Sequence, residues 1–425
     1  MKKGLLLISS LLVSCSLAAQ TIDWLPSDDT HDYQGIALSA NGRYIAGLSK
    51  ATAGGFVWDT TDKKEFLSGE DNGSILTGVS DNGIAVGYDT NDAPTMLDIN
   101  TNKTSVIEEG VAATPYSVSS DGKVIVGYMT GDDGYVHACL WKDGQRTMLP
   151  EPTAEEAGLG GVLGTDAKWA SKDGSVILGN LYEDMYGQGW PLAMIWRLQK
   201  DGTYKPDFIY NGFYDVEGNA SKPYYSFEAA GISDNGKWVS LKTKSYGTYQ
   251  GQSTLFPDRL ARMNLETRQV KECVPGNGLQ DLGYITGGIA NDGTVVGAIN
   301  PNYRKAVIWK AGEASALQLA MAYGLMEIND LYNSAAIGIS ADGRYITGFG
   351  KVEEEGASRT FWIDTKGTTN GIANAETTAN PVTTSVYGVD GTFLGSSIKS
   401  LPKGIYIVKT SDGKTTTSKK IIVNK

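Results

Sequence analysis

The sequence has few of the residues that carry much enzyme chemistry. Its 425 residues include two histidines and three cysteines. Two histidines cannot supply a three-histidine metal site, and they leave little imidazole for proton transfer. Neither His31 nor His137 has an H-x-x-x-H partner, and no P-loop, G-x-S-x-G or strand-linked G-x-G-x-x-G motif occurs. These absences disfavour NTPases, serine hydrolases and dinucleotide enzymes, and we expect no metal and no cofactor.

Excess positive charge is also lacking. The formal net charge of −11 argues against a nucleic-acid partner. The one long apolar run, Leu5 to Leu17, follows Lys2 and Lys3 and is too short to span a bilayer. With the small residues up to Ala19 it predicts a signal peptide over residues 1–19 and no transmembrane segment after its removal. The segment ending at Cys15 (Leu-Val-Ser-Cys) is a rival, because it resembles a lipobox; we favour cleavage after Ala19.

Signal removal leaves Cys139 and Cys273. They fall in repeat units that are not neighbours, so we expect two separately buried thiols rather than a disulfide.

Glycine, by contrast, is abundant, with 53 residues, and much of it belongs to a repeat. The repeat occurs seven times and consists of a short apolar stretch, then Ser-x-Asn/Asp-Gly or a variant, then an apolar strand. The turn glycines are Gly42, Gly83, Gly122, Gly174, Gly236, Gly293 and Gly343. Asn-Gly or Asp-Gly between strand-like runs predicts a β-hairpin, and such a pair is typical of a type I′ turn.

Each hairpin is followed by a third apolar strand and a short fourth one. Five third strands end on tryptophan, namely Trp58, Trp141, Trp196, Trp309 and Trp362, and the other two copies place Asp98 and Asn264 there. Four antiparallel strands repeated seven times predict a seven-bladed β-propeller over residues 20–365, with the tryptophans packed between blades. The last copy lacks a fourth strand, and we expect Ile22–Pro26 to supply it.

These copies resemble the HAF-type repeats of bacterial extracellular proteins, whose units read G-I-S-x-D/N-G, V-V-G and A-x-x-W. The resemblance covers about residues 34–365. It implies a surface or secreted propeller and assigns no activity. Copy five departs most, because Val239-Ser240 stands where other copies have Val-Gly.

Residues 366–383 are small and polar and read as a linker. In residues 384–425 apolar and polar side chains alternate as they do in β-strands, which predicts a small β-sandwich. This tail resembles the type A sorting domain of the type IX (Por) secretion system of Bacteroidetes. The matching positions are Gly391, Gly404, Ile405, Tyr406, Lys419 and Lys420. The resemblance implies that secretion machinery exports the chain through the periplasm, for release or for attachment to the outer cell surface.

The distribution of charged residues agrees with a division between the propeller, as exported cargo, and the C-terminal tail. The tail carries seven lysines and two aspartates, whereas residues 20–383 carry 28 basic and 46 acidic side chains. An acidic propeller with a basic export tail is the organisation we expect.

Copies four to seven are longer than the first two, and insertions in a repeat array often build its binding face. Residues 182–250 hold 15 aromatic side chains in 69 positions. Such rings suit glycan or peptide capture, although they would equally pack long loops onto the blades. The candidate ligand-binding residues are Tyr182, Tyr186, Trp190, Tyr210, Tyr214, Tyr224, Tyr225 and Tyr246.

Carboxylates in the same region keep a second function open. They are Glu183, Asp184, Asp215, Glu217 and Glu228. A carbohydrate-active hydrolase or lyase would need two of them across a cleft, which sequence cannot place. A structural or adhesive surface protein is the third hypothesis. We expect a secreted binding protein that uses loops of copies four and five.

Overall fold

The computed structural model describes residues 22–423 apart from several gaps. The gaps are residues 29–30, 70–72, 210–223, 250–251, 256–258, 274–283, 300–303, 326–331, 352–355, 367–382, 389–391, 396–401 and 412–415. The expected signal peptide and most of the expected linker lie outside the described residues. The chain divides into two compact units, Met1–Gly367 and Thr368–Lys425. In the part that is described, no helix is long and apolar enough to cross a membrane.

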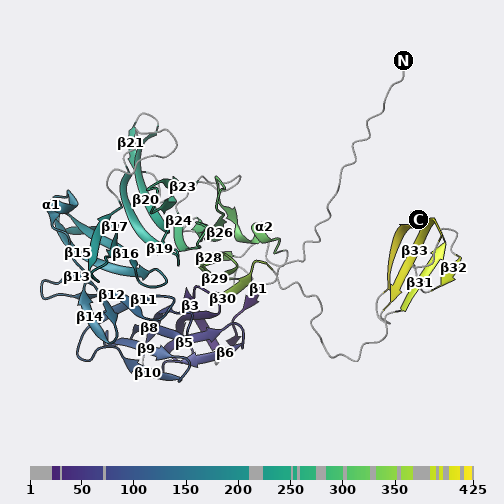
Figure 1. The fold of residues 1–425 in the computed structure, drawn as a ribbon, viewed down its shortest axis with the longest axis horizontal. Helices are drawn as coiled ribbons and strands as arrows, with labels where there is room; N and C mark the ends of the chain where they lie inside the picture. Colours follow the sequence, from purple (N-terminus) through teal and green to yellow (C-terminus); the bar gives the residue numbers. More distant parts are fainter. Residues whose placement is uncertain are drawn as a thin grey trace, which may run out of the picture. The chain divides into compact units, whose positions relative to one another are not determined.

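The first unit is a β-propeller. Its described strands form seven antiparallel sheets, numbered here 1 to 7 in the order of the sequence copies, and consecutive sheets pack side by side around an axis (Figure 1). The innermost strands are β3 (His31–Leu38), β7 (Ile75–Val79), β11 (Ala113–Val118), β15 (Val162–Ala170), β19 (Tyr224–Ile232), β24 (Tyr284–Ile289) and β28 (Tyr332–Ile339).

The remaining strands follow outward in the same order in each sheet. The second strands are β4 (Tyr44–Ser49), β8 (Ile84–Tyr88), β12 (Val124–Thr130), β16 (Val176–Met185), β20 (Trp238–Tyr249), β25 (Val295–Ile299) and β29 (Tyr345–Lys351). The third are β5 (Gly54–Asp59), β9 (Pro94–Asp98), β13 (Val136–Lys142), β17 (Gln188–Leu198), β22 (Arg259–Asn264), β26 (Lys305–Trp309) and β30 (Arg359–Asp364). The outer strands are β6 (Lys64–Leu67), β10 (Lys103–Val106), β14 (Gln145–Met148), β18 (Tyr204–Phe208), β23 (Val270–Glu272), β27 (Leu317–Gln318) and β1 (Ile22–Trp24).

Four short elements complete this unit. Strand β2 (Ser27–Asp28) pairs with β3, and β21 (Gln252–Leu255) pairs with the far end of β20. The helices among the described residues are α1 (Ala154–Ala157) and α2 (Leu319–Tyr323). Helix α1 begins at a capping box in which Thr153 and Glu156 bond each other's backbone amides.

The N-terminal strand takes the place expected for it. Strand β1 pairs with β30, so that Ile22 lies opposite Ile363 and Trp24 opposite Phe361. The ring of Trp24 meets that of Phe361 edge to face at 6.0 Å, and the next residue, Leu25, is buried. The first and last parts of the unit therefore share one sheet.

The Ser-x-Asn/Asp-Gly segments form the expected hairpins, but not through type I′ turns. Among the described residues with positive φ are all seven turn glycines and none of the preceding Asn or Asp residues. In the first copy the Gly42 amide bonds the Ser39 carbonyl, and the buried Ser39 hydroxyl donates to Asn41 and accepts from the Tyr44 amide. These Asn and Asp side chains accept backbone bonds inside the turn, which removes the need for a second left-handed residue.

The glycine that closes the second strand has a different role. A Cβ on Gly47, Gly87, Gly127 or Gly179 would lie about 2 Å from a backbone carbonyl of the innermost strand, for example 1.8 Å from the Asp166 oxygen in the case of Gly179. In sheet 5 the paired position is Leu241, opposite Ala229, and Ser240 lies opposite Gly231. In copy five, therefore, Leu241 stands at the position where the other copies have the closing glycine.

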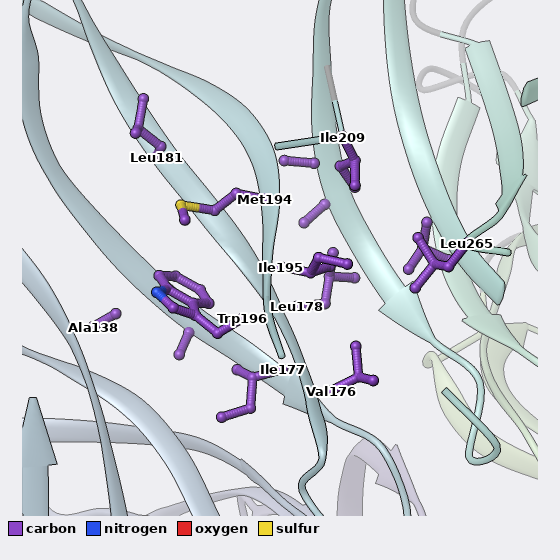
Figure 2. Close-up of a cluster of buried hydrophobic side chains, with 14 of the residues drawn as sticks. Ala138, Val176, Ile177, Leu178, Leu181, Met194, Ile195, Trp196, Ile209 and Leu265 are labelled. Carbon is purple, nitrogen blue, oxygen red and sulfur yellow. The ribbon is translucent and has the colours of Figure 1, made fainter. Parts of the chain in front are cut away.

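The hydrophobic core fills the spaces between neighbouring sheets. The largest fully buried side chains include Trp141, Trp196 and Trp309. Figure 2 shows β17 contributing to both sides, with Trp196 toward Ala138 of sheet 3 and Ile195 toward Leu265 beyond β22. Burial on both faces explains why these strands read as continuous apolar runs.

Strand register corrects the tryptophan alignment. In sheet 1 the closing Gly47 pairs with Phe56, and Trp58 lies two residues after Phe56. The residues at the same place in three other sheets are Leu97 in sheet 2, Met263 in sheet 5 and Ile363 in sheet 7. Asp98 and Asn264 follow that place by one residue and accept backbone bonds from the next turn. Trp362 precedes it by one, stacks on Tyr345 at 5.2 Å and bonds Gly42 of sheet 1.

The described strands of the second unit form one antiparallel sheet in the order β32-β31-β33-β34, where the sequence predicted a small β-sandwich. Its strands are β31 (Thr383–Gly388), β32 (Phe393–Gly395), β33 (Gly404–Ser411) and β34 (Thr416–Val423). Val386 and Tyr406 are its buried apolar side chains among the described residues, while Ile405 and Phe393 are exposed. Gly404 and Ile405 begin β33, Lys419 and Lys420 lie in β34, and Gly391 lies outside the described residues.

Cys139 and Cys273 are both buried thiols and are not joined in a disulfide, as expected. Desolvation by burial raises the pKa of the Cys139 thiol to about 12. It is therefore a packing residue and not a nucleophile.

Candidate functional site

A β-bulge interrupts the register of all seven innermost strands at the same level. Each bulge leaves one residue, or two in sheet 6, without a paired partner. These residues are Ile36, Thr77, Tyr116, Lys168, Ala230, Gly287 with Gly288, and Ile337. We call them the bulge ring.

The bulge ring surrounds a cavity on the propeller axis. The cavity holds about 340 Å³ and is lined by every bulge residue except Lys168, together with neighbouring residues of the same strands. Its wall is uneven, because sheet 3 contributes Tyr116 and sheet 4 Trp169, whereas sheets 5 and 6 contribute Ala230, Gly287 and Gly288. A Cβ on Gly287 or Gly288 would meet the backbone of sheet 7, so these glycines allow sheets 6 and 7 to pack closely.

A buried carboxylate lies two residues before the bulge of sheet 4. Asp166 is 2% exposed. Its Oδ1 accepts from the backbone and side-chain nitrogens of Asn180 at 2.9 and 3.1 Å, and its Oδ2 accepts from the Tyr182 hydroxyl at 2.6 Å. Burial, followed by the Asp166 charge, raises the pKa of Tyr182, which keeps that hydroxyl a donor.

The bulge residue Lys168 completes this group. Its ammonium lies 3.4 Å from Asp166 Oδ2 and 5.2 Å from the centre of the Tyr116 ring, and its side chain is 16% exposed. Desolvation lowers the pKa of Lys168, but the Asp166 charge and smaller contributions outweigh it, so the net pKa is raised. Lys168 is thus a fixed cation and not an amine nucleophile.

Sheet 5 repeats the carboxylate at the same place. Glu228 lies two residues before its bulge and forms a 2.5 Å ion pair with Lys242, which stands where sheet 4 has Asn180. The seven residues at this place are Gln34, Ile75, Thr114, Asp166, Glu228, Ile285 and Ala335. The two neighbouring sheets 4 and 5 alone carry an acid there. We call Asp166, Lys168, Tyr182, Glu228 and Lys242 the charged cluster.

The same two sheets carry the longest strands. Strands β16 and β17 have 10 and 11 residues and β20 has 12, whereas β8 and β9 have five each. We call the β16–β17 hairpin end and the β20–β21 pair the two arms; Figure 1 shows β21 reaching beyond the neighbouring strands. Tyr182 is the member of the charged cluster that lies in β16, on the strand that leads to the tip of the first arm.

The tip of the first arm displays an aromatic ring. Met185 pairs with Gln188 across Tyr186 and Gly187, whose φ angles of 58° and 79° fit a type I′ turn. Tyr186 is fully exposed at 101%. A tyrosine with positive φ is costly where Asn or Gly would serve, and strain of this kind is characteristic of functional positions.

The other aromatic candidates divide into three groups. Trp190 is half-buried in β17, opposite Glu183. Tyr224 and Tyr225 begin β19, and Tyr246 lies in β20 opposite Leu255. Tyr210 and Tyr214 lie outside the described residues. The structure thus places Tyr182, Tyr186 and Trp190 on one arm.

The candidate acids have mostly structural partners. Asp184 Oδ1 accepts from the Gly187 amide in the arm turn, and Glu228 pairs with Lys242. Burial raises the pKa of the half-buried Glu183. Asp215 and Glu217 lie outside the described residues.

No group of three or more His, Cys, Asp or Glu side chains is placed to hold a metal ion within the described residues. His31 bonds Asp28, and His137 lies between Asp133 and Glu151. Asp89 and Asp133 lie in loops with several acidic residues, and both accept backbone hydrogen bonds within their own turns.

Sequence reasoning missed Asp166, Lys168, Tyr116 and Lys242. The sequence signal for Asp166 and Lys168 is the segment Thr-Asp-Ala-Lys-Trp before the fourth turn, where other copies place mainly apolar or small residues. Charges in an innermost strand become informative once the copies are aligned on their bulges.

No protein-family model and no curated protein matches the chain. Among solved structures, the oligogalacturonate lyase of Vibrio parahaemolyticus is 12% identical, with 82% of this chain and 94% of that one covered and a TM-score of 0.52. The Cps50 (Swd1) β-propeller domain of Myceliophteria thermophila is 11% identical over 81% and 99%, with a TM-score of 0.43. TolB of Acinetobacter baumannii is 14% identical, with 77% of this chain aligned and a TM-score of 0.40, and the alignment spans 64% of TolB. Likeness at such identities concerns the fold alone, and the propeller is defined by the sheet order of this chain itself.

Proposed function

We propose that residues 20–365 form a secreted seven-bladed propeller that binds a glycan on the face bearing the two arms. The carrying observation is that sheets 4 and 5 depart together from the other copies. Both have an acid before the bulge and longer strands. Departures confined to neighbouring units favour one shared site, because random drift would scatter them around the ring.

The chemistry of this face favours a glycan. Tyr186 offers an exposed ring at the arm tip, and the charged cluster offers fixed donors and acceptors. Sugars present apolar ring faces together with hydroxyl groups, and they bind where aromatic rings and hydrogen-bonding groups alternate.

The second hypothesis, a carbohydrate-active hydrolase or lyase, is less well supported. Both carboxylate oxygens of Asp166 already accept hydrogen bonds, and Glu228 is engaged by Lys242. An acid–base pair for glycoside cleavage needs one carboxyl group free to donate or accept a proton at the substrate. A purely structural or adhesive protein, the third hypothesis, gives no reason for a strained, exposed Tyr186.

For the second unit we propose the role of a type IX (Por) sorting domain in a HAF-type repeat protein of Bacteroidetes, read by the secretion machinery. The exposed Phe393 and Ile405 and the exposed Lys409 and Lys420 support this proposal. They give a small sheet both apolar and cationic side chains for a receptor.

The test is an array of glycans probed with the mature chain, residues 20–425, beside a peptide array. We expect glycan capture that Tyr186→Ala weakens. The matched control is Tyr135→Ala, because Tyr135 is 42% exposed in the corresponding loop of sheet 3. Capture of peptides alone, or equal losses in both variants, would overturn the proposal.

A further inference from the structure

The axial cavity is a built compartment and not a gap between loops. Its volume of about 340 Å³ lies at the low end of the range for small-molecule sites, roughly 300–1,000 Å³. Its wall comes from the innermost strands of all seven sheets, each of which is paired along its length with a second strand. The cavity therefore has a fixed size, with room for a molecule of one sugar ring.

The two sides of the cavity differ. Tyr116 and Trp169 stand in sheets 3 and 4, with their rings 6.0 Å apart. About halfway around the ring, Gly287 and Gly288 of sheet 6 have no side chain. A Cβ on either glycine would meet the sheet 7 backbone, so the distinctive side of the cavity is the aromatic one, which offers a flat or ring-shaped group a surface to stack on.

The two ends of the cavity differ in charge. Lys168 does not itself line the cavity, but at the bulge level its ammonium lies 5.2 Å from the centre of the Tyr116 ring, which does, and 3.4 Å from Asp166. At the hairpin-turn end, Asp234 lines the cavity and accepts from the Ser120 hydroxyl. Asp81 lies close by, and its pKa is raised by burial and then by the Asp234 charge. An anion is therefore repelled at the turn end and attracted at the Lys168 end.

The Lys168 ammonium also has hydrogen-bonding capacity to spare. Its ion-pair contact with Asp166 is 3.4 Å long, and both Asp166 oxygens already accept shorter bonds from Asn180 and Tyr182. An ammonium carries three N–H donors. A ligand oxygen beside Tyr116 can accept from one that Asp166 does not use.

We propose that the axial cavity binds the terminal unit of an acidic glycan, a sugar acid whose carboxylate takes the Lys168 ammonium while its ring lies against Tyr116 and Trp169. This inference rests on the proposed glycan-binding function and names the class of sugar. The carboxylate points to the face with the arms, so the rest of the chain leaves along β16.

The experiment titrates the mature chain with D-glucuronate and with D-glucose, which differ in one carboxylate, by calorimetry. We expect glucuronate to bind roughly tenfold or more tightly, as a charge-assisted bond implies. Lys168→Met should abolish that preference, and Lys168→Arg should keep most of it. Ala230→Leu, which fills the cavity and leaves the charge, should weaken glucuronate binding. Lys237→Met is the matched control, because Lys237 pairs with Glu266 on the surface.

Each outcome decides the matter. Equal affinities for the two sugars, no glucuronate binding, or a preference that survives in Lys168→Met with a native melting temperature would overturn the acidic-sugar site. If the glycan array still shows Tyr186-dependent capture in that case, the proposed function stands without it. If the array shows no glycan capture while glucuronate binds as expected, the cavity is a small-molecule site and the arms are not a glycan site.

Discussion

The Ala341 amide donates a 2.7 Å hydrogen bond to the Ala40 carbonyl, and this bond joins the hairpin turn of sheet 7 to that of sheet 1. Similar bonds link each turn to the next around the axis, as between Asn41 and Asp81 and between Lys172 and Asp234. The repeated turn sequence thus serves two purposes, since it closes each hairpin and ties neighbouring sheets together. The β1–β30 pairing is a second closure of the same ring.

The N-terminal closure can be tested at Leu25, which is 3% exposed between the first and last sheets. Leu25→Ala should lower the free energy of unfolding by about 2–5 kcal/mol, because it leaves a cavity in that interface. Chemical denaturation measures the change. Leu317→Ala is the control, since Leu317 is 47% exposed and its truncation should have little effect. Equal losses in both would show that the N-terminal strand contributes no closure.

The closing glycines can be tested at Gly179. An added Cβ would lie 1.8 Å from the Asp166 carbonyl oxygen. Gly179→Ala should therefore cost roughly 1–3 kcal/mol of stability or shift the bulge, as overpacking does. Gly160→Ala is the matched control, because nothing lies within 4 Å of a Cβ there. A melting temperature that is the same for both variants would contradict the clash.

His137 predicts a pH-dependent contribution to stability. Burial lowers its pKa, but hydrogen bonds to Asp133 and Glu151 outweigh burial and raise the pKa above 6.5. A raised pKa means that the stabilisation is complete below the unfolded value of about 6.5 and is lost as the pH rises through the folded pKa. His137→Gln should therefore lower the melting temperature more at about pH 5.5 than at about pH 8.5. A larger loss at the higher pH would show the opposite linkage.

The sorting role predicts where a truncated protein accumulates. Deleting residues 384–425 should leave the propeller in the periplasm, because the secretion machinery would have no tail to recognise. Removing residues 366–383 while keeping the tail should still allow export. Surface labelling of intact cells distinguishes the two variants. Surface exposure of the tail-less chain would refute the sorting proposal.

The repeat made the architecture predictable. Hairpins, third strands and the spare N-terminal strand all follow from apolar runs and turn glycines whose preferences are local. The turn type was wrong, because the Ser39 hydroxyl and the Asn41 side chain satisfy the turn in a way that the Asn-Gly pair alone does not reveal. The tryptophan alignment was shifted in three copies, because register depends on pairing partners and not on the count from a turn.

The candidate site, like the fold, was predictable from the sequence only in part. Sequence alone directed attention to copies four and five, through their length and aromatic content, and it named Tyr182, Tyr186 and Glu228. Tertiary structure decided that Asp166 and Lys168, spaced like ordinary strand residues, lie beside Glu228 of the next sheet and the Tyr116 ring of the previous one. A bulge displaces one residue of each innermost strand, or two in sheet 6, from the ladder, and successive bulges around the axis are at least 39 residues apart in the chain. Composition and local periodicity therefore specify the sheets, whereas the closing of the ring creates the site.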